Sequence, residues 1–275
     1  RAPVHDMDYL MRHRWMISLG AVVALVCLAL LIWEPLMRFR PWAPIPDTLT
    51  GFERSLFGRK DKQYTPDEVK RLREHIDRQV ARGESLLPLY ETDAAFFDAS
   101  LLDLKPADSV ADIGCGTGAA EIAALEKGVP FAHWYLVELH PATMEFARYA
   151  VSKAFPSAAD RIVTIISTPL DLGLPPRSVD VVFMINVRLA MPRFQGEVQP
   201  PAWKIKATLE SLKQALRPAA RIHLFEPVLD DAGDPYPLQN LIRNYLSNGF
   251  EVVKQNEIEV RVPMYHVVLR VAAKS

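Results

Sequence analysis

The sequence contains little cysteine: Cys27 and Cys115 are the two cysteines in 275 residues. Cys27 lies in an apolar run and Cys115 in a glycine-rich turn, so we do not expect a structural disulfide, which favours a reducing compartment. No group of cysteine and histidine residues has the spacing of a metal site, and no serine, histidine and aspartate set indicates a nucleophilic triad. Net charge is nearly absent too, because 32 basic and 33 acidic residues give −1. The charge balance therefore gives no reason to expect a nucleic-acid partner.

A further absence is local, because no charged residue occurs from Trp15 to Trp33, a run of 19 residues. As a helix this run would be ~30 Å long, the thickness of the hydrocarbon core of a bilayer. Tryptophans stand at both ends, where interfacial aromatic residues belong. A signal peptide would be shorter and followed by a cleavage site, and a buried core helix is the other alternative. We therefore predict a transmembrane helix over residues 15–37, after a short polar tail at residues 1–14.

Residues 38–63 combine prolines with basic residues and predict a juxtamembrane linker. Pro41, Pro44 and Pro46 exclude a long regular element and favour a stiff connector. The basic and aromatic residues that follow are either an ordinary basic collar or a surface that lies on anionic lipid. Positive charges are balanced on the two sides of the apolar run, so they do not fix its orientation. The remaining residues, 64–275, are expected to form one large domain.

That domain is organised around a glycine-rich turn, Gly-Cys-Gly-Thr-Gly, at residues 114–118. The apolar residues before it predict a short buried strand that contains Asp112, and the apolar residues after it predict a helix. Gly114 can take a positive φ where the strand ends, Gly116 lets a ligand approach the backbone, and Gly118 opens the helix. The free N–H groups at the start of the helix then face the ligand. Strand, turn and helix together predict a nucleotide-binding site.

The next candidate residue is Glu138, which lies 20 residues after Gly118 at the end of the next strand-like segment, residues 131–138. A carboxylate at this place can accept hydrogen bonds from both hydroxyls of a ribose. An NAD site uses a related glycine turn with an acid at a similar distance, so these residues alone leave NAD as an alternative.

Strand-like and helix-like segments alternate after the turn, which predicts a doubly wound sheet. The last two strand-like segments are separated by only a few residues, so they must pair antiparallel. The expected fold class is α/β, a mostly parallel seven-stranded sheet with an antiparallel C-terminal pair, preceded by one transmembrane helix. The predicted strands are residues 110–113, 131–138, 161–167, 179–186, 220–226, 250–257 and 261–271. The predicted helices are residues 66–81, with Thr65 as the cap, 93–104, 119–125 after the glycine turn, 141–155, 207–216 and 238–247.

The segment Asp-Ile-Gly-Cys-Gly-Thr-Gly, residues 112–118, resembles motif I of class I methyltransferases that depend on S-adenosylmethionine (SAM). The closing antiparallel pair is the layout of that fold and not of the usual NAD domain. The resemblance covers about residues 85–270, and Val179–Phe183 is similar to the family's fourth-strand motif. The family usually has two glycines in its turn into strand five, where this chain has Ala219 and Ala220, which predicts a slightly different turn.

The resemblance implies SAM as the cofactor and assigns roles by position. Glu138 would hold the ribose, Leu139 and His140 would line the adenine side, and Thr168 stands where the family often has an acid for the adenine amino group. Asn186, at the end of the fourth strand, would be a cofactor-binding and positioning residue at the place of methyl transfer. The methionine portion would be held by Asp112 and by the turn residues Gly114, Cys115, Gly116, Thr117 and Gly118.

A base is needed only if the methyl acceptor must lose a proton. The candidates by residue type are His140, His223, His266 and Glu226, each of which could equally have a structural role. Residues 90–92, Tyr-Glu-Thr, lie between the first two predicted helices and either contact the substrate or form an ordinary polar loop.

The resemblance and the apolar run together predict a membrane-anchored SAM-dependent methyltransferase that acts on a small or lipophilic, membrane-associated acceptor. Because SAM is made in the cytosol, we expect the domain on the cytosolic side of the membrane. One alternative is a methyltransferase-like accessory subunit of a membrane protein complex, without turnover. The other is an NAD(P)-dependent oxidoreductase, against which the C-terminal strand pair argues.

Overall fold

The computed structural model describes residues 66–86, 97–185, 187, 201–228, 238–260 and 263–273. Within these ranges no helix combines the length and the apolar character that crossing a bilayer requires. The predicted transmembrane helix and linker lie outside the described residues and stay predictions. The same holds for Asn186 and for the segment 90–92.

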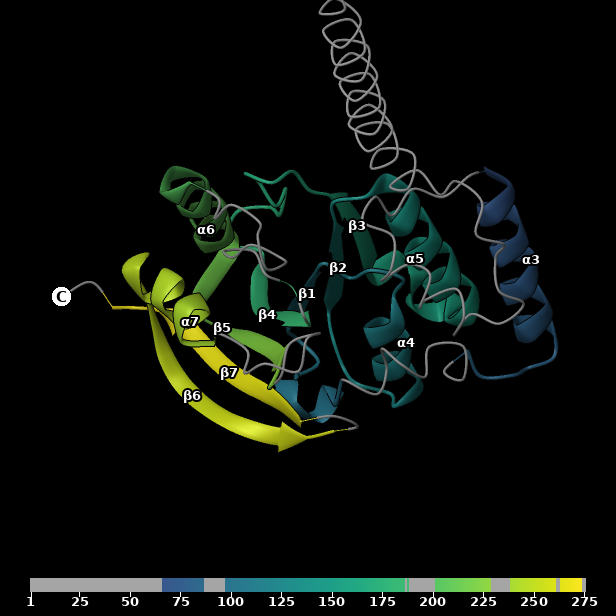
Figure 1. Ribbon diagram of the computed structural model, residues 1–275. Coiled ribbons are helices and arrows are strands. Elements are labelled where there is room, and N and C mark those ends of the chain that lie inside the picture. The colour runs from purple at the N-terminus through teal and green to yellow at the C-terminus, as the bar shows by residue number, and fades with distance from the viewer. Residues whose placement is uncertain are drawn as a thin grey trace, which may run out of the picture. The chain divides into compact units, whose positions relative to one another are not determined.

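A seven-stranded sheet forms the centre of the domain, with the strand order β3-β2-β1-β4-β5-β7-β6 (Figure 1). The five strands from β3 to β5 are parallel, while β7 pairs antiparallel with both β5 and β6. The predicted sheet, including its antiparallel C-terminal pair, is thus confirmed. The strands are β1 Ser109–Ile113, β2 His133–Glu138, β3 Ile162–Ile166, β4 Val179–Ile185, β5 Leu216–Pro227, β6 Phe250–Glu259 and β7 Pro263–Val271.

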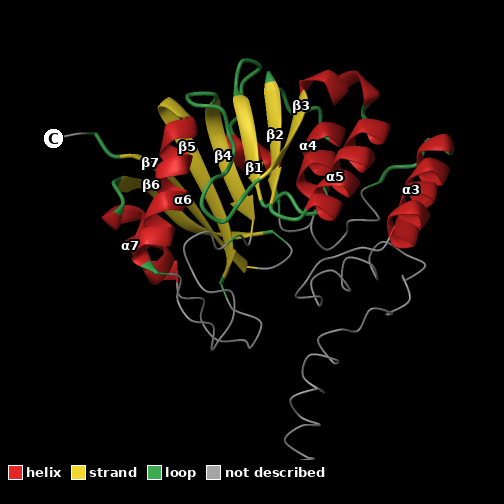
Figure 2. Ribbon diagram, turned by 90° about the horizontal axis from the view of Figure 1, so that it is seen from above, coloured by secondary structure: helices red, strands yellow, loops and turns green. Residues whose placement is uncertain are grey.

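Helices cover both faces of the sheet, as a doubly wound fold requires (Figure 2). Helices α4 and α5 lie on one face, and α6 and α7 lie on the other (Figures 1 and 2). Burial on both faces explains why every residue of β1 is buried and why β4 is an almost continuous apolar segment. The helices are α3 Pro66–Ala81, α4 Ala119–Glu126, α5 Pro141–Ala154, α6 Ala202–Ala215 and α7 Leu238–Ser247, with the 3₁₀ helices η3 Ala99–Leu102 and η4 Pro156–Arg161.

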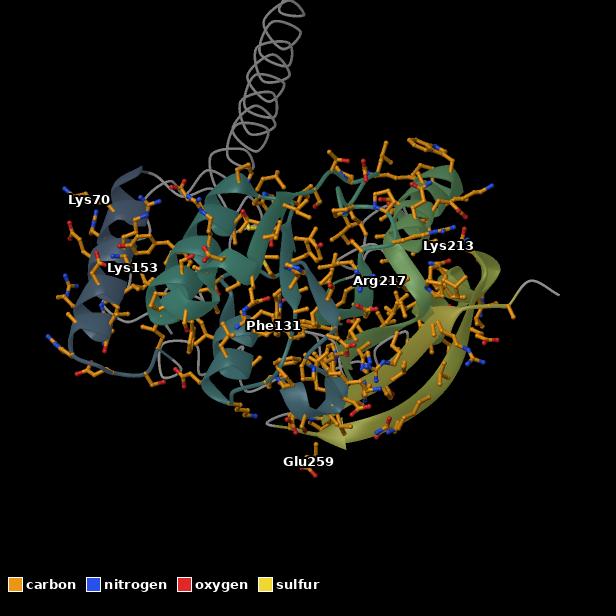
Figure 3. All side chains as sticks on the ribbon, turned by 180° about the vertical axis from the view of Figure 1, so that it is seen from behind. Lys70, Phe131, Lys153, Lys213, Arg217 and Glu259 are labelled. Atoms are coloured by element: carbon orange, nitrogen blue, oxygen red, sulfur yellow. The ribbon has the colours of Figure 1, made fainter. Side chains whose placement is uncertain are left out.

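The face under α6 and α7 carries the larger apolar core. Leucines of α6 and α7, such as Leu209 and Leu241, pack with Val182 of β4 and Leu224 of β5, and all four side chains are fully buried. On the opposite side of the domain, α3 packs on α5 through polar contacts. Asp77 of α3 accepts a hydrogen bond from the hydroxyl of Tyr149 of α5 at 2.7 Å. Lys153 of α5, labelled in Figure 3, forms an ion pair with Asp77 at 3.2 Å.

Three predicted elements differ from the structure, and the first is α6, which begins at Ala202 rather than at residue 207. In place of a helix over residues 93–104, the described residues show only η3, because Asp98 caps the N–H of Ser100 and Asp103 takes a left-handed conformation that ends the turn. Residues 93–96 lie outside the described part. Strand β5 begins at Leu216 rather than at residue 220, and it contains the predicted different turn: Ala219 has φ +65°.

Candidate cofactor site

The glycine-rich turn lies where the order of the sheet reverses. Strands β2 and β3 follow β1 on one side, and β4 then returns to pair with β1 on the other side. Crevices at such reversals, outside the carboxyl ends of the strands, are where doubly wound sheets bind ligands. Gly114, directly after β1, and Val187, just after β4, meet at this point: a Cβ on Gly114 would lie 2.5 Å from a γ-carbon of Val187. The structure therefore places the turn at the position expected for a ligand.

The three glycines of the turn all have positive φ, but each has its own surroundings. Gly114 is anchored to β2, because its N–H donates to the carbonyl of Val137 at 2.7 Å. A Cβ on Gly118 would lie 3.1 Å from a γ-carbon of Val151, so Gly118 lets α5 pack against the start of α4. A Cβ on Gly116 would meet nothing closer than 3.9 Å. Gly116 therefore faces open space, as an approaching ligand requires.

The carboxylate of Glu138 lies against the glycine turn. Its Oε2 accepts a hydrogen bond from the N–H of Gly116 at 3.1 Å, and its Oε1 accepts from the N–H of Leu139 at 2.7 Å and of His140 at 3.1 Å. The side chain is 5% exposed. Three backbone donors thus fix the carboxylate: they use both lone pairs of Oε1 and one of Oε2, so Oε2 retains a lone pair for a hydroxyl donor of a ligand.

A second carboxylate, which the sequence interpretation did not include, lies beside the strand. Glu121 in the first turn of α4 is 1% exposed, and its Oε1 accepts a hydrogen bond from the indole N–H of Trp134 at 3.1 Å. Burial and the neighbouring Glu121 carboxylate raise the pKa of Asp112 well above its ordinary range. Burial likewise raises the pKa of Glu121, against the hydrogen bond from Asp112. The signal in the sequence was a single acid in the otherwise apolar segment Ala-Ala-Glu-Ile-Ala-Ala.

The site is electronegative and has no compensating cation among the described residues. No salt bridge of this part of the chain includes Asp112, Glu121 or Glu138. Burial and the same three carboxylates raise the pKa of the Cys115 thiol well above its ordinary range, so this side chain stays neutral. Within the described residues, no group of three metal-ligating side chains is arranged to hold a metal ion. The arrangement suits an organic ligand that carries positive charge.

The other predicted cofactor residues lie around the same edge of the sheet, but they are engaged differently. Leu139 is 38% exposed directly after Glu138. The hydroxyl of Thr168 forms a local turn, accepting from the N–H of Asp171 at 3.0 Å and of Leu170 at 3.3 Å. An adenine contact at Thr168 would have to replace one of these bonds, so that role stays a prediction. Asn186 lies outside the described residues.

The candidate bases are distributed over the fold. His140 is the N-cap of α5, next to Glu138. His223 and His266 are buried in the β5–β7 pair, with Nδ1 of His223 3.0 Å from Nε2 of His266. Burial lowers the pKa of both imidazoles, of His223 to about 3 and of His266 to about 4. Glu226, at the end of β5, is fully buried. The two buried histidines are therefore neutral members of the core.

Comparisons with known proteins agree with this geometry. The sequence profile of a family described as a methyltransferase domain matches residues 111–222. A search of curated proteins found no match. Two solved structures of the glycopeptide N-methyltransferase MtfA are similar to this chain. The complex with sinefungin is 14% identical, with a TM-score of 0.52 over 66% of this chain and 86% of that one. The other is 13% identical, with a TM-score of 0.51 over 65% and 90%.

A SAM-dependent methyltransferase from Aquifex aeolicus is 18% identical, with a TM-score of 0.48 over 75% of this chain and 99% of that chain. At such identities the two MtfA structures show a common fold and no more. Residues 111–222, which run from β1 into β5, thus match the profile of a methyltransferase domain, and the chain shares its fold with the two MtfA structures.

Proposed function

We propose that this chain is a membrane-anchored methyltransferase that transfers the methyl group of SAM to a small or lipophilic acceptor held at the membrane. The uncharged run between Trp15 and Trp33 supports the anchor, since its length matches a bilayer core. A tethered domain meets acceptors that are themselves confined to the membrane far more often than dissolved ones, because tethering raises their effective concentration. SAM is a cytosolic metabolite, which supports a cytosolic domain.

The observation that carries the cofactor assignment is the cluster of buried carboxyl groups around the glycine turn. SAM brings a sulfonium and an ammonium group, and its positive charge complements Asp112, Glu121 and Glu138. A dinucleotide such as NAD brings a pyrophosphate, whose negative charges would lie at the start of α4 beside Glu121. Like charges at close range in a buried site are repelled strongly. The same turn thus favours SAM over NAD on electrostatic grounds.

The chemistry demands alignment more than proton transfer. SAM, when bound, would supply a methyl group on a sulfonium, which a nucleophilic atom of the acceptor would take in one in-line displacement with S-adenosylhomocysteine as the leaving group. The turn and Glu138 would orient the cofactor, and exclusion of water would favour the charge-dispersing displacement. The end of β4, with Asn186, is the place from which we expect the acceptor to be positioned.

Binding measurements separate the cofactors. Isothermal titration calorimetry of the full-length chain should show heat of binding with SAM and with S-adenosylhomocysteine, but none with NAD. Binding of NAD and not of SAM would contradict the proposal. Transfer of a labelled methyl group from SAM into lipid or pigment extracts then tests turnover. A chain that binds SAM, transfers no methyl group and copurifies in fixed ratio with a membrane complex would instead be an accessory subunit.

Fractionation tests the anchor. The full-length chain should stay in the membrane pellet after alkaline carbonate extraction, whereas a variant that lacks residues 1–63 should be found in the supernatant and still bind SAM. Release of the full-length chain by carbonate would contradict a transmembrane anchor. A full-length variant with two leucines of the apolar run replaced by alanines, which keeps the run uncharged, is the matched control and should remain in the pellet.

A further inference from the structure

We propose that Asp112 and Glu121 share one proton in the empty site, as a carboxyl group hydrogen-bonded to a carboxylate, and that SAM binding expels this proton. The inference rests on the proposed cofactor and assigns Glu121 as a positioning residue that acts through Asp112. It starts from two buried acids on neighbouring elements, one at the end of β1 and one in the first turn of α4, exposed by 3% and 1%.

The first step concerns how Glu121 is held. The indole N–H of Trp134 donates to its Oε1 at 3.1 Å. Trp134 cannot move aside, because its ring is 1% exposed and packs edge-on against Phe131 at 5.4 Å and Phe183 at 5.8 Å. The second oxygen, Oε2, is buried and has no hydrogen-bond partner among the described residues. A protonated neighbour is the partner that satisfies it.

That neighbour is Asp112. Asp112 and Glu121 lie close enough in the buried core to shift each other's pKa, and two carboxyl groups so placed can hydrogen-bond only if a proton lies between them. Glu121 is the better anion of the two, because it also accepts from Trp134 and lies at the positive end of α4. The proton therefore resides on Asp112, which donates to the Glu121 carboxylate. Burial and repulsion from Glu121 and Glu138 raise the pKa of Asp112 accordingly.

The remaining groups around the pair do not offer a competing proton or cation. Glu138 of β2 is occupied by three backbone donors. The Cys115 thiol has a raised pKa and stays neutral. The adjoining side chains of β4 and β2, Phe183 and Trp134, do not titrate. Among the described residues, no lysine, arginine or histidine forms an ion pair with either acid.

A cationic ligand changes this balance. When SAM occupies the turn that directly follows Asp112, its ammonium and sulfonium charges stabilise a second carboxylate and lower the affinity of the pair for the proton. The proton leaves to solvent, and the site then holds two carboxylates against a cation. After transfer the sulfur is neutral, so part of that charge is lost and reprotonation of the pair favours release of the product. The exchange of product for a new SAM molecule would thus be coupled to the uptake and release of one proton by Asp112 and Glu121.

Calorimetry of the full-length chain tests this. SAM is titrated at pH 6.5 in buffers of different ionisation enthalpy, where an α-amino group is already protonated and contributes little. The wild type should release close to one proton per SAM bound. From pH 5.5 to 7 its dissociation constant should fall by up to about tenfold per pH unit, as one linked proton requires.

Glu121→Gln keeps the shape and the Trp134 acceptor but cannot share a proton with Asp112. This variant should release close to no proton, and its dissociation constant should be nearly independent of pH over the same range. Glu126→Gln, the same change at the exposed end of α4, should behave like the wild type. Thermal unfolding reports whether each variant is folded.

Two results would overturn the inference while leaving SAM as the cofactor: SAM binding by the wild type without proton release, or equal proton release by the wild type and Glu121→Gln. The first needs no variant, so it decides even if Glu121→Gln does not fold. Absence of any SAM binding by the wild type would instead contradict the proposed function, and this inference with it.

Discussion

At the scale of single residues, Glu138 combines a structural and a ligand-binding task. Glu138→Ala removes the acceptor proposed for the ribose hydroxyls and leaves the N–H groups of Gly116, Leu139 and His140 without their partner. Hydrogen bonds to charged groups contribute about 1.5–3 kcal/mol each, so we expect SAM affinity to fall roughly ten- to a hundredfold. Calorimetry measures it, with Glu257→Ala on the exposed face of β6 as the control. Unchanged affinity in Glu138→Ala would remove the ribose role.

Ala219 is a residue whose backbone conformation does not suit its side chain. It is exposed and has φ +65°, where a Cβ costs about 1–2 kcal/mol. Ala219→Gly relieves that strain but makes the unfolded chain more flexible, at a cost of about 0.4–1 kcal/mol. We expect a net gain in the free energy of unfolding of about 0.5–1 kcal/mol, measured by urea denaturation. Ala207→Gly, within α6, should lose about 1 kcal/mol. Destabilisation by both would argue against strain at Ala219.

At the scale of elements, the two ends of α4 offer a matched pair of glycines. Gly118 and Gly128 both have positive φ, +85° and +67°. A Cβ on Gly118 would press on Val151 and Ala147 of α5, whereas a Cβ on Gly128 would meet nothing within 4 Å. Both alanine variants should therefore lose about 1–2 kcal/mol through the backbone. Gly118→Ala should lose more, and it alone should weaken SAM binding.

Urea unfolding and calorimetry on the same two variants measure both effects. Equal losses of stability at the two positions would mean that α5 can move away from the added Cβ at no cost in free energy. Equal SAM affinities would mean that the α4–α5 contact does not affect cofactor binding.

The periodicity of apolar residues and the positions of proline and glycine predicted most elements of the domain, for reasons that particular residues make clear. Leu238–Ser247 is observed with its predicted bounds, and α3 and α5 begin at Pro66 and Pro141, which are suited to the first turn of a helix. The start of β5 was missed, because Arg217 and Pro218 resemble a turn; the strand there is continued by pairing of Leu216 with Val179. Pairing between residues this far apart in the sequence cannot be predicted from the local pattern of residue types.

The site was predictable where it is local in sequence and not where it depends on packing. The glycine turn and Glu138 could be read from their spacing. Glu121 could not be assigned, since its significance comes from Trp134, a contact across 13 positions that only the sheet and α4 together create. The hydroxyl of Thr168 was expected to face a ligand, but in the structure it accepts a hydrogen bond from the N–H of Asp171 in a local turn.

At the scale of the whole molecule, the buried histidines make the stability of the domain depend on pH. His223 and His266 lie in the β5–β7 pair, and the ring of His266 stacks on Phe225 at 4.7 Å. Nε2 of His223 and Nδ1 of His266 have no hydrogen-bond partner among the described residues. Burial, followed by repulsion from positive neighbours, including Lys254, lowers the pKa of His223 to about 3 and of His266 to about 4. Both rings are therefore neutral in the folded protein near neutral pH.

In the unfolded chain the same histidines titrate near pH 6.5. Between that pH and the folded values of about 3 and about 4, the unfolded state binds more protons, so stability must fall as the pH is lowered through this window. Above about pH 7 the effect is absent, because both states are neutral. Each histidine contributes a slope of at most about 1.4 kcal/mol per pH unit. Urea denaturation from pH 7.5 to pH 4.5 should show this loss, superimposed on that of the carboxylates.

The double variant His223→Leu, His266→Leu isolates the histidines, because it keeps the core apolar and removes both titrating rings. Its free energy of unfolding should decline less steeply than that of the wild type between pH 6.5 and pH 4.5, and in parallel with it above pH 7. His133→Leu, at the exposed start of β2, should retain the wild-type slope. If the double variant kept that slope as well, the acid sensitivity would have to come from carboxyl groups such as Asp77 and Asp171, whose pKa is lowered by hydrogen bonds in the folded state.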